Sequence, residues 1–320
     1  MISTTDEREG RGPSRLVSVV ISCYNSERTI REVVELSMAE FARMDGYDCE
    51  FVLVDDCSSD RTFEVIRQLA DEHPNVRGAS LMRNFGQHNG LMCAMHFAQG
   101  DYVLGMDDDL QTHPSQIPAL IKRMEEGFDL VYGCYRESLN GSLKRFTSWL
   151  NKVTSNKLLG RPEGIRASNF WVISSQVKDQ VIRYANYNPN VDALFTRMTR
   201  RVANVTIEHH QRAYGSSGYT LAKLARLWLA YFNYTVVPLR IVSAVGVITA
   251  GVGFFAGVVT VVRKVLNPGM MAGWASTICV LLFFFGLVLL TLGVIGEYLG
   301  NIVLSINSTP QFIVRDKVNL

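Results

Sequence analysis

Short apolar runs alternate with amphipathic stretches in the part of the chain before residue 210. The runs have the length and β-branched content of buried strands, whereas the stretches carry apolar residues at helical spacing. This alternation predicts a doubly wound α/β sheet with helices on both faces. The predicted strands are Leu16–Ile21, Cys49–Val54, Val76–Leu81, Tyr102–Met106, Phe128–Tyr132, Asn169–Ile173 and, at the outside of the sheet, Asn204–His209.

The stretches between the first strands predict amphipathic helices. The helix after the second strand follows a polar turn, in which either Ser59 or Asp60 is placed to cap the first free backbone N–H groups. The predicted helices are Ile30–Met38, Phe63–Leu69, Asn89–Gln99 and Pro114–Glu126.

The pattern changes to long apolar runs after residue 238. Segments 239–262 and 272–295 are each roughly 24 residues long, above the ~20 needed to cross the hydrocarbon core of a bilayer. Their link contains the turn signal Asn267-Pro268-Gly269. These features predict a transmembrane hairpin. Before it, residues 220–238 place apolar and aromatic residues at helical spacing with basic residues among them, which favours an amphipathic helix in the membrane interface over an ordinary core helix.

Basic residues predict the orientation of the hairpin. The link carries only Arg263 and Lys264, and more basic residues precede the first span, so the positive-inside rule places residues 15–219 in the cytoplasm of an inner-membrane protein. Two crossings return the chain to a cytoplasmic tail, residues 296–320. Residues 1–14 lack the apolar core of a signal peptide and are expected to be disordered. The basic residues before the link are Arg197, Arg200, Arg201, Arg212, Lys223, Arg226 and Arg240.

Composition excludes several classes of protein. The 32 Lys and Arg residues nearly balance the 30 Asp and Glu residues, so the chain lacks the charge of a nucleic-acid-binding protein. Its six cysteines have no zinc-site spacing and are expected to be free thiols. The glycine-rich motifs of dinucleotide-binding and P-loop enzymes are missing. His209 and His210 would face opposite sides of a strand, which favours a structural role over a shared metal.

Three consecutive carboxylates, Asp107, Asp108 and Asp109, follow the predicted strand Tyr102–Met106. Their repulsion and desolvation are tolerable when a divalent cation lies among them, and oxygen ligands suit Mg²⁺ or Mn²⁺. If strand geometry persists, Asp107 and Asp109 point the same way and form the metal-facing pair. An isolated acidic triplet is more often a solvated turn. Its position at a strand's carboxyl end, where ligands of doubly wound sheets bind, favours a metal site instead.

A metal-binding carboxylate pair on such a sheet, next to a membrane, suggests transfer from a nucleotide-activated donor to a lipid. The metal would neutralise the departing diphosphate. Asp55 and Asp56, at the end of an earlier strand, could accept hydrogen bonds from base N–H groups, and Glu27 could hold the base or the ribose.

Five stretches together resemble a known family. They are Val20-Ile21-Ser22-Cys23-Tyr24-Asn25-Ser26-Glu27, Val54-Asp55-Asp56-Cys57-Ser58-Ser59-Asp60-Arg61-Thr62, Arg83-Asn84-Phe85-Gly86-Gln87, Asp107-Asp108-Asp109-Leu110-Gln111 and Arg212-Ala213-Tyr214-Gly215-Ser216-Ser217-Gly218-Tyr219. With the hairpin, they resemble family 2 glycosyltransferases of the GT-A fold. The likeness is to the polyprenyl-phosphate sugar transferases, which include dolichyl-phosphate mannose synthases, GtrB-type glucosyltransferases and undecaprenyl-phosphate aminoarabinose transferases.

The resemblance implies a role for each matching residue. Asp107 and Asp109 correspond to the metal-binding DxD pair, and Gln111 to a third ligand. The nucleotide would be bound by Ser22, Tyr24, Glu27, Asp55, Asp56, Arg83, Gly86 and Asp108. The acceptor phosphate would be held by Arg136, Arg145, Arg212 and Ser216. The resemblance implies that these three arginines, together with Asp107 and Asp109, are the catalytic residues.

The family also implies the reaction. A sugar would move from a nucleotide-sugar, expected to be UDP-linked, to polyprenyl (undecaprenyl) phosphate by one in-line displacement that inverts the sugar's C1. The acceptor phosphate is already an anion, so no strong general base is required. The product would donate its sugar to cell-surface glycans such as lipopolysaccharide. Relatives include monomers and tetramers, so a homo-oligomer remains an open alternative.

Two positions depart from the family pattern. Ser22 stands where proline is frequent, which affects only the turn. Ser168-Asn169-Phe170-Trp171 stands where relatives commonly have Gly-Asp-Phe-Arg in a region facing the sugar and acceptor, so two charges are lost. We therefore expect a donor other than the familiar glucose and mannose cases, or one read by different contacts. On this hypothesis, restoring both residues changes the donor preference.

Two other functions remain open. A processive polysaccharide synthase shares the fold but requires more membrane spans and a Gln-x-x-Arg-Trp motif, and this sequence has neither. A non-catalytic, membrane-anchored scaffold of the same fold is the alternative from a different class. The complete metal triad and arginines favour an enzyme over the scaffold.

Overall fold

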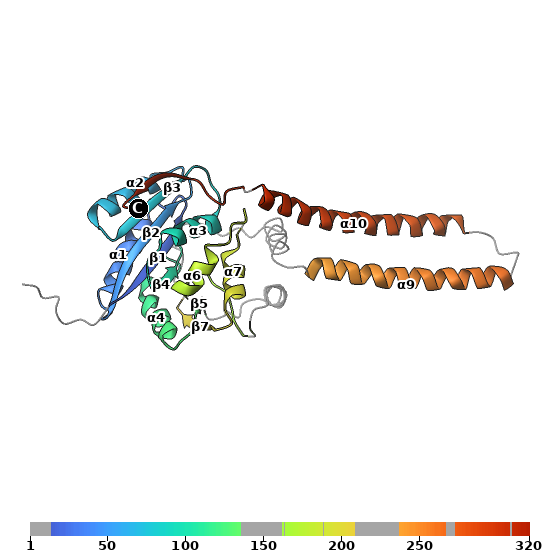
Figure 1. Cartoon of the computed structure of the whole chain (residues 1–320), viewed down its shortest axis with the longest axis horizontal. Coiled ribbons are helices and arrows are strands. Elements are labelled where there is room, and N and C mark those ends of the chain that lie inside the picture. The colour runs from blue at the N-terminus through green and yellow to red at the C-terminus, as the bar shows by residue number, and fades with distance from the viewer. Residues whose placement is uncertain are drawn as a thin grey trace, which may run out of the picture. The chain divides into compact units, whose positions relative to one another are not determined.

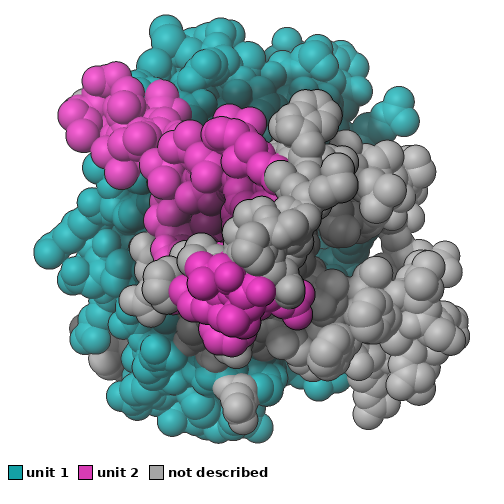
Figure 2. All heavy atoms as spheres, turned by 90° about the vertical axis from the view of Figure 1, so that its right-hand side faces the viewer, with its two compact units in different colours: residues 1–218, 308–320 teal, residues 219–307 magenta. Residues whose placement is uncertain are grey.

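The computed structural model describes residues 14–135, 162, 164–187, 189–208, 237–266, 273–307 and 309–320. The chain divides into two compact units. Unit 1 comprises Met1–Gly218 and Ser308–Leu320, and unit 2 comprises Tyr219–Asn307 (Figure 2). The membrane-type segment is therefore inserted within the sequence of the globular unit rather than appended to its end.

Unit 1 is built on a mixed eight-stranded sheet with the strand order β7-β5-β6-β4-β1-β2-β3-β8 (Figure 1). The central strands β3, β2, β1 and β4 are parallel, β6 is antiparallel to both β4 and β5, and β7 lies at the predicted outer edge. All seven predicted strands form, with ends shifted by up to three residues. The strands are β1 Arg15–Cys23, β2 Tyr47–Asp55, β3 Val76–Leu81, β4 Tyr102–Gly105, β5 Leu130–Tyr135, β6 Trp171–Ser174, β7 Val202–Ile207 and β8 Val314–Val318.

Helices cover both faces of this sheet, as the sequence predicts. On one face α1 (Ile30–Phe41), α2 (Thr62–Glu72) and α4 (Ile117–Glu125, after a 3₁₀ turn at Pro114–Gln116) bury their apolar residues against the strands. The other face carries α3 (Gln87–Phe97), and beside it α6 (Ser175–Val181) and α7 (Val191–Met198). Burial of both faces explains why the strands read as continuous apolar runs.

Asp60 supports the start of α2, where the sequence offered either Ser59 or Asp60 as the cap. Its Oδ1 accepts the backbone N–H of Thr62 at 3.0 Å and its Oδ2 accepts the backbone N–H of Glu27 at 3.2 Å. Hydrogen bonding lowers the pKa of the Asp60 carboxyl, although burial opposes the shift. The same carboxylate therefore joins the turn after β2 to the turn after β1.

The predicted C-terminal tail, residues 296–320, is not a separate tail. Its first part continues α10, which ends at Ile306, and Val314–Val318 forms β8 at the edge of the sheet. β8 pairs antiparallel with β3. Local pattern did not reveal this strand because Arg315, Asp316 and Lys317 are charged, as is common on an exposed sheet edge.

Among the described residues of unit 2, two helices are long and apolar enough to cross a membrane, judged by length and composition. They are α9, Val237–Leu266, and α10, Trp274–Ile306. Their apolar windows are Val242–Val259 and Phe283–Ile306. Many of their large apolar side chains are exposed, Phe255 at 70% and Leu289 at 68% among them, which is stable in lipid but not in water. Most of the predicted interfacial helix (220–238), the turn 267–269 and residues 1–13 lie outside the described residues.

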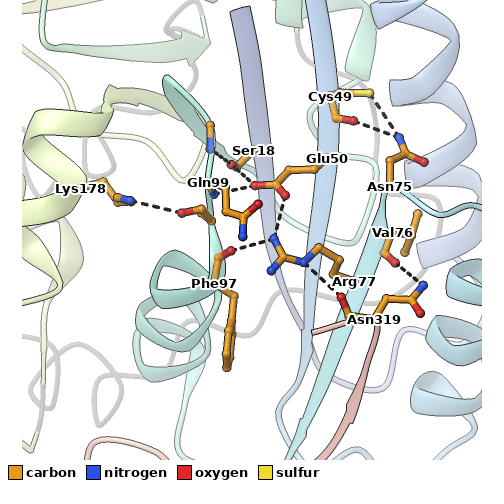
Figure 3. Close-up of polar contacts among 12 residues, drawn as sticks. Ser18, Cys49, Glu50, Asn75, Val76, Arg77, Phe97, Gln99, Lys178 and Asn319 are labelled. Carbon is orange, nitrogen blue, oxygen red and sulfur yellow. Dashed lines mark hydrogen bonds and ion pairs between the residues drawn. The ribbon is translucent and has the colours of Figure 1, made fainter.

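A buried ion pair joins the central strands at the end opposite the strands' carboxyl ends (Figure 3). Glu50 of β2 accepts hydrogen bonds from Ser18 Oγ at 2.5 Å and from the Gln99 backbone N–H at 2.6 Å. Arg77 of β3 donates to Glu50 Oε2 at 2.8 Å. The Arg77 and Glu50 side chains are only 16% and 8% exposed, so this pair connects three strands and the loop before β4 in a region with little water.

Replacing Arg77 with Met should destabilise unit 1 by about 3 kcal/mol, because it leaves the Glu50 carboxylate buried without its cation. The matched control is Arg43→Met, which removes the exposed Arg43–Glu40 pair and should cost less than about 1 kcal/mol. Thermal unfolding of the full chain in detergent measures both. Equal melting temperatures for the two variants would show that the buried pair has no special contribution.

Candidate active site

The carboxyl ends of the parallel strands β1, β2 and β4 border a cavity of about 400 Å³. Ligands of α/β sheets bind at this edge. Ten residues line the cavity: Ser22, Tyr24, Asp56, Asn84, Gly86, Gln87, Asp107, Asp108, Asp109 and Asn169. The structure therefore brings together seven of the predicted site residues, including the whole acidic triplet.

Asp107 accepts hydrogen bonds from two side-chain amides of the cavity. Its Oδ1 accepts a hydrogen bond from Gln87 Nε2 at 2.7 Å, and Asn169 Nδ2 lies 3.1 Å from its Oδ2. Burial raises the pKa of the Asp107 carboxyl to about 6, with further contributions from Asp109 and Asp108, although the two amide groups oppose the shift. Negative charge at Asp107 is thus only partly compensated by the protein.

Asp108 and Asp109 are held by backbone groups. Asp108 Oδ2 accepts the backbone N–H of Tyr24 at 3.2 Å, and burial raises the pKa of the Asp108 carboxyl. Asp109 Oδ1 accepts the backbone N–H of Gln111 at 3.1 Å. Because β4 ends at Gly105, strand alternation does not orient this triplet as predicted. Asp107 and Asp109 nevertheless line the same cavity, whereas the Gln111 side chain is not among its lining residues.

Asp56 lines the same cavity and holds a loop that contributes to its wall. Its Oδ1 accepts the backbone N–H of Phe85 at 2.7 Å and its Oδ2 accepts that of Gly86 at 2.8 Å. These two residues belong to the 82–86 loop between β3 and α3, and Gly86 has a φ of 90°, a conformation that favours glycine. Burial raises the pKa of the Asp56 carboxyl, against the two hydrogen bonds. Both carboxylate oxygens of Asp56 thus hold the loop.

Three other predicted nucleotide contacts lie elsewhere. Asp55 is 3% exposed and accepts hydrogen bonds from the Ser58 backbone N–H and from Ser80 Oγ, so its carboxylate braces the turn instead of lining the cavity. Glu27 lines a separate hollow and accepts the Arg61 backbone N–H at 3.1 Å. Arg83 is exposed, with its guanidinium 4.6 Å from the centre of the Phe85 ring.

The predicted acceptor-phosphate residues Arg136, Arg145, Arg212 and Ser216 lie outside the described residues. The same holds for His209 and His210. Their roles stay predictions.

The two positions that depart from the family pattern have very different environments. Asn169 lines the cavity beside Asp107, as expected of a residue that faces the substrate. Trp171 is 3% exposed and packs edge-to-face on Phe195, with ring centres 4.6 Å apart. A Cβ on Gly105, its partner across β4 and β6, would lie 2.3 Å from the Trp171 ring. The expectation that Trp171 faces the sugar or acceptor is therefore wrong, because the side chain fills the core.

Sequence reasoning missed Asn84 and Gln87 as cavity residues. Both stand in the stretch Arg83–Gln87 that carried the family resemblance, which was the available signal. Gln87 is the first residue of α3, and the helix start turns its amide towards Asp107. Gly90, one turn later, allows α3 to approach β1, since a Cβ there would lie 2.2 Å from Ser22 Oγ.

Left-handed backbone conformations follow each of the three strands at the cavity. Asn25, Cys57 and Leu110 have φ values of 55°, 58° and 60°. Asn tolerates this region, and the Asn25 side chain accepts hydrogen bonds from the Ser59 backbone N–H and hydroxyl. Cys57 and Leu110 have no such advantage, so strain of the kind stored at functional sites surrounds the cavity.

The carboxylates suit a hard divalent cation. Mg²⁺ and Mn²⁺ take oxygen ligands, and Mg²⁺ is commonly bound by one or two carboxylates together with substrate phosphates. Among the residues the structure describes, no group of three or more His, Cys, Asp or Glu side chains could hold a metal by itself. Asp107 and Asp109 line one cavity, and two carboxylates suit an ion whose other ligands come from a phosphate-bearing substrate.

Because Asn169 and Trp171 lie in different environments, substitutions at the two positions should affect the stability of the protein differently. Trp171→Arg should cost about 3–5 kcal/mol, because it removes a core ring and buries a charge. Asn169→Asp should cost less than Trp171→Arg, because the side chain borders the cavity instead of filling the core, although it places a carboxylate beside Asp107 in place of an amide donor. Expression and melting temperature in detergent test both, and a stable Trp171→Arg protein would contradict the packing described. The donor preference predicted from this region is consequently tested with Asn169→Asp alone.

Deprotonation of Asp107 should make the metal-free protein less stable as the pH rises through about 6. A carboxyl whose pKa is raised on folding is bound to its proton more tightly in the folded state, so its stabilising effect is present at pH 4 and is lost as the pH passes about 6. Asp107→Asn should reduce this loss between pH 4 and 7. Melting temperatures measured between pH 4 and 7 in the presence of a chelator give this loss of stability. Substitution of the exposed residue Asp71, Asp71→Asn, is the control. Equal pH slopes for Asp107→Asn and wild type would contradict the shift.

Comparison with known proteins identifies a family and relatives that this chain resembles. Residues 18–181, just over half of the chain, match the sequence model of glycosyl transferase family 2. The chain is 31% identical to the undecaprenyl-phosphate 4-deoxy-4-formamido-L-arabinose transferase of Edwardsiella ictaluri, over 95% of this chain and 94% of that protein. Its counterpart in Proteus mirabilis is 29% identical over the same shares.

Solved structures give the same fold. Glucosyl-3-phosphoglycerate synthase from Mycobacterium tuberculosis in complex with phosphoglyceric acid superposes with a TM-score of 0.51 at 22% identity, covering 69% of this chain and 80% of that one. Its complex with Mn²⁺, uridine diphosphate and glucosyl-3-phosphoglycerate gives a TM-score of 0.50 at 20% identity, with the same coverage. The sheet is thus of the GT-A type, and the chain belongs to glycosyl transferase family 2.

Proposed function

We propose that this glycosyltransferase moves a sugar from a nucleotide-sugar to undecaprenyl phosphate, or a similar polyprenyl phosphate, at the cytoplasmic face of the inner membrane. The observation that carries the proposal is that Asp56, Asp107, Asp108 and Asp109 line the same cavity at the carboxyl edge of the sheet. It occurs in a chain whose curated relatives, matched over 95% of its length, are undecaprenyl-phosphate sugar transferases. The two apolar helices of unit 2 supply a membrane location suited to a lipid acceptor.

The donor side of the reaction would use the described cavity. Asp107 and Asp109 would hold Mg²⁺ or Mn²⁺, a role supported by their shared cavity, by the raised pKa of Asp107 and by the Mn²⁺–uridine diphosphate complex of the solved neighbour. When bound, the ion would neutralise charge on the diphosphate leaving group. Tyr24 and the 82–86 loop would form the nucleotide wall, with Ser22 beneath them.

Asp56 and Asp108 would act on the donor through the backbone. Asp56 holds the N–H groups of Phe85 and Gly86, and Asp108 holds that of Tyr24. Both carboxylates thereby fix the walls of the cavity before any ligand enters, which reduces the entropy lost on binding. Asp55 and Glu27 would support the turns after β2 and β1 instead of contacting the base.

The acceptor would need little activation. A phosphate monoester is an anion at neutral pH, so one of its oxygens can attack the sugar C1 directly. The C1–oxygen bond to the nucleotide diphosphate breaks as the new bond forms, and C1 is inverted. Arg136, Arg145, Arg212 and Ser216 are proposed to hold this phosphate, since guanidinium groups pair bidentately with phosphate oxygens. Their task would be to bring two anions together.

The orientation in the membrane follows from chain order and charge. Unit 1 contains residues on both sides of the α9–α10 segment in sequence, because β8 completes its sheet. A hairpin that crosses the membrane twice returns the chain to the side it left, which is consistent with β8 pairing with β3. The excess of basic residues before α9 favours the cytoplasmic side for unit 1.

The sugar is proposed to differ from glucose and mannose. Asn169 borders the cavity where the family pattern places a carboxylate, and it approaches Asp107 through its amide nitrogen. A neutral side chain there changes the charge presented to the sugar. The nucleotide is expected to be uridine diphosphate.

A transfer assay tests the function. Purified full-length protein in detergent is given undecaprenyl phosphate, Mn²⁺ or Mg²⁺, and a panel of UDP-, GDP- and dTDP-linked sugars, and lipid products are read by mass spectrometry. One donor should give a lipid-phosphate-sugar. Asp109→Asn should lower the rate by at least about 100-fold, as expected for losing a charge at a metal that stabilises the transition state. The exposed Asp71→Asn is the matched control.

The alternative outcomes discriminate between the enzyme and the scaffold. Metal-dependent binding of nucleotide without transfer from any donor would indicate a donor outside the panel. Absence of both binding and transfer would overturn the proposal in favour of the non-catalytic scaffold, which has no reason to bind nucleotide.

A further inference from the structure

The last segment of the chain, residues 309–320, contacts several parts of unit 1 besides β3. Gln311, only 8% exposed, donates from Nε2 to the backbone carbonyls of Tyr184 and Asn186 at 2.5 and 2.8 Å. At the other end, Asn319 Nδ2 donates to the Val76 carbonyl (Figure 3) and to the Ala70 carbonyl. The segment is therefore fixed at both ends, on either side of β8.

Between these ends, the segment holds one residue of the cavity loop by both of its backbone groups. The Met82 N–H donates to the Ile313 carbonyl at 2.9 Å, and the Met82 carbonyl accepts a hydrogen bond from Arg315 Nη2 at 2.8 Å. Met82 directly follows β3 and is the first residue of the 82–86 loop. The C-terminal segment thus fixes the point at which this loop leaves the sheet.

A β-bulge aims Arg315 at this point. Ser80 pairs with Asp316 and Leu81 with Val314, so Arg315 is the extra residue between two paired positions. Bulges re-aim side chains, and they are frequent at sheet edges and beside active sites. Here the bulge lies at the end of β3, and the guanidinium reaches past that end to the Met82 carbonyl.

The far end of the 82–86 loop is fixed by the cavity. The N–H groups of Phe85 and Gly86 donate to Asp56. Immediately after the loop, Gln87 donates to Asp107. The loop is therefore a short span held by Arg315 at its start and by Asp56 at its end, and the end of the loop at Gly86 is only four residues beyond Met82.

We propose that Arg315 is a positioning residue for the donor cavity, acting through Met82 on the 82–86 loop. The segment that follows the membrane hairpin would then complete the donor site as well as the sheet. Only the identity of the ligand rests on the proposed function. The position of the loop can be measured without any ligand.

Lys317 offers a matched control on the same strand. It is also basic and exposed, but its Nζ lies 4.9 Å from the centre of the Phe97 ring, at the last residue of α3, and no contact of its side chain with the 82–86 loop is seen in the described structure. Lys317→Ala therefore weakens β8 docking without removing the hydrogen bond to Met82. Arg315→Lys keeps a charged donor in place.

The first test is hydrogen–deuterium exchange of the full chain in detergent, without metal or nucleotide. Arg315→Ala should speed exchange of peptides that cover residues 83–87 by about three- to tenfold, the change expected from losing one hydrogen bond of ordinary net strength at an exposed side chain. Arg315→Lys should lie closer to wild type, and Lys317→Ala should leave these peptides unchanged. Faster exchange confined to 314–318, or equal effects of Arg315→Ala and Lys317→Ala, would overturn the proposal.

The second test uses uridine diphosphate with Mn²⁺ as the probe in titration calorimetry. Arg315→Ala should weaken binding about fivefold at unchanged melting temperature, with partial recovery in Arg315→Lys. Wild-type affinity in Arg315→Ala would overturn the proposal. If wild-type protein does not bind the probe, the proposed donor is wrong, and the exchange experiment still decides the role of Arg315.

Discussion

The accumulation of negative charge at one edge of the sheet is the constraint on which the rest of unit 1 depends. Asp56, Asp107, Asp108 and Asp109 share one cavity, and burial raises the pKa of three of them. Buried carboxylates are tolerable only where hydrogen-bond donors or cations compensate them. Backbone N–H groups of Tyr24, Phe85 and Gly86 and the amides of Gln87 and Asn169 provide part of that compensation. The remaining charge is what suits the cavity to a cation and a diphosphate.

These donors come from segments far apart in the sequence, so the fold must hold them with little freedom. The buried ion pair between Glu50 and Arg77 connects the strands at the end of the sheet opposite the cavity. The C-terminal segment adds β8 outside β3 and holds Met82, where the cavity loop begins. Because this segment follows the apolar helices, the complete sheet exists only when the chain has returned from unit 2.

Local pattern predicted much of this architecture. Val76–Leu81 was predicted with the observed bounds, and the other six predicted strands form with ends shifted by up to three residues. The acidic triplet was recognisable from its place after such a run. β8 was missed, because its charged residues carry no period of burial. Trp171 was assigned to the substrate side, because a motif comparison gives the position of a side chain in the sequence but not the layer into which it points.

The sequence by itself determined seven of the strands, the helices between the first of them, the two membrane-length helices and the residue types that carry the chemistry, because burial and charge periodicity are local properties. Only the tertiary structure decided which carboxylates share the cavity and which brace a turn. Of two adjacent residues, Asp56 lines the cavity and Asp55 braces the turn after β2. The tertiary structure also decided that Trp171 fills the space beside Gly105 and that Arg315 reaches Met82. These outcomes depend on register, a bulge and distances between distant segments, which no single stretch of sequence encodes.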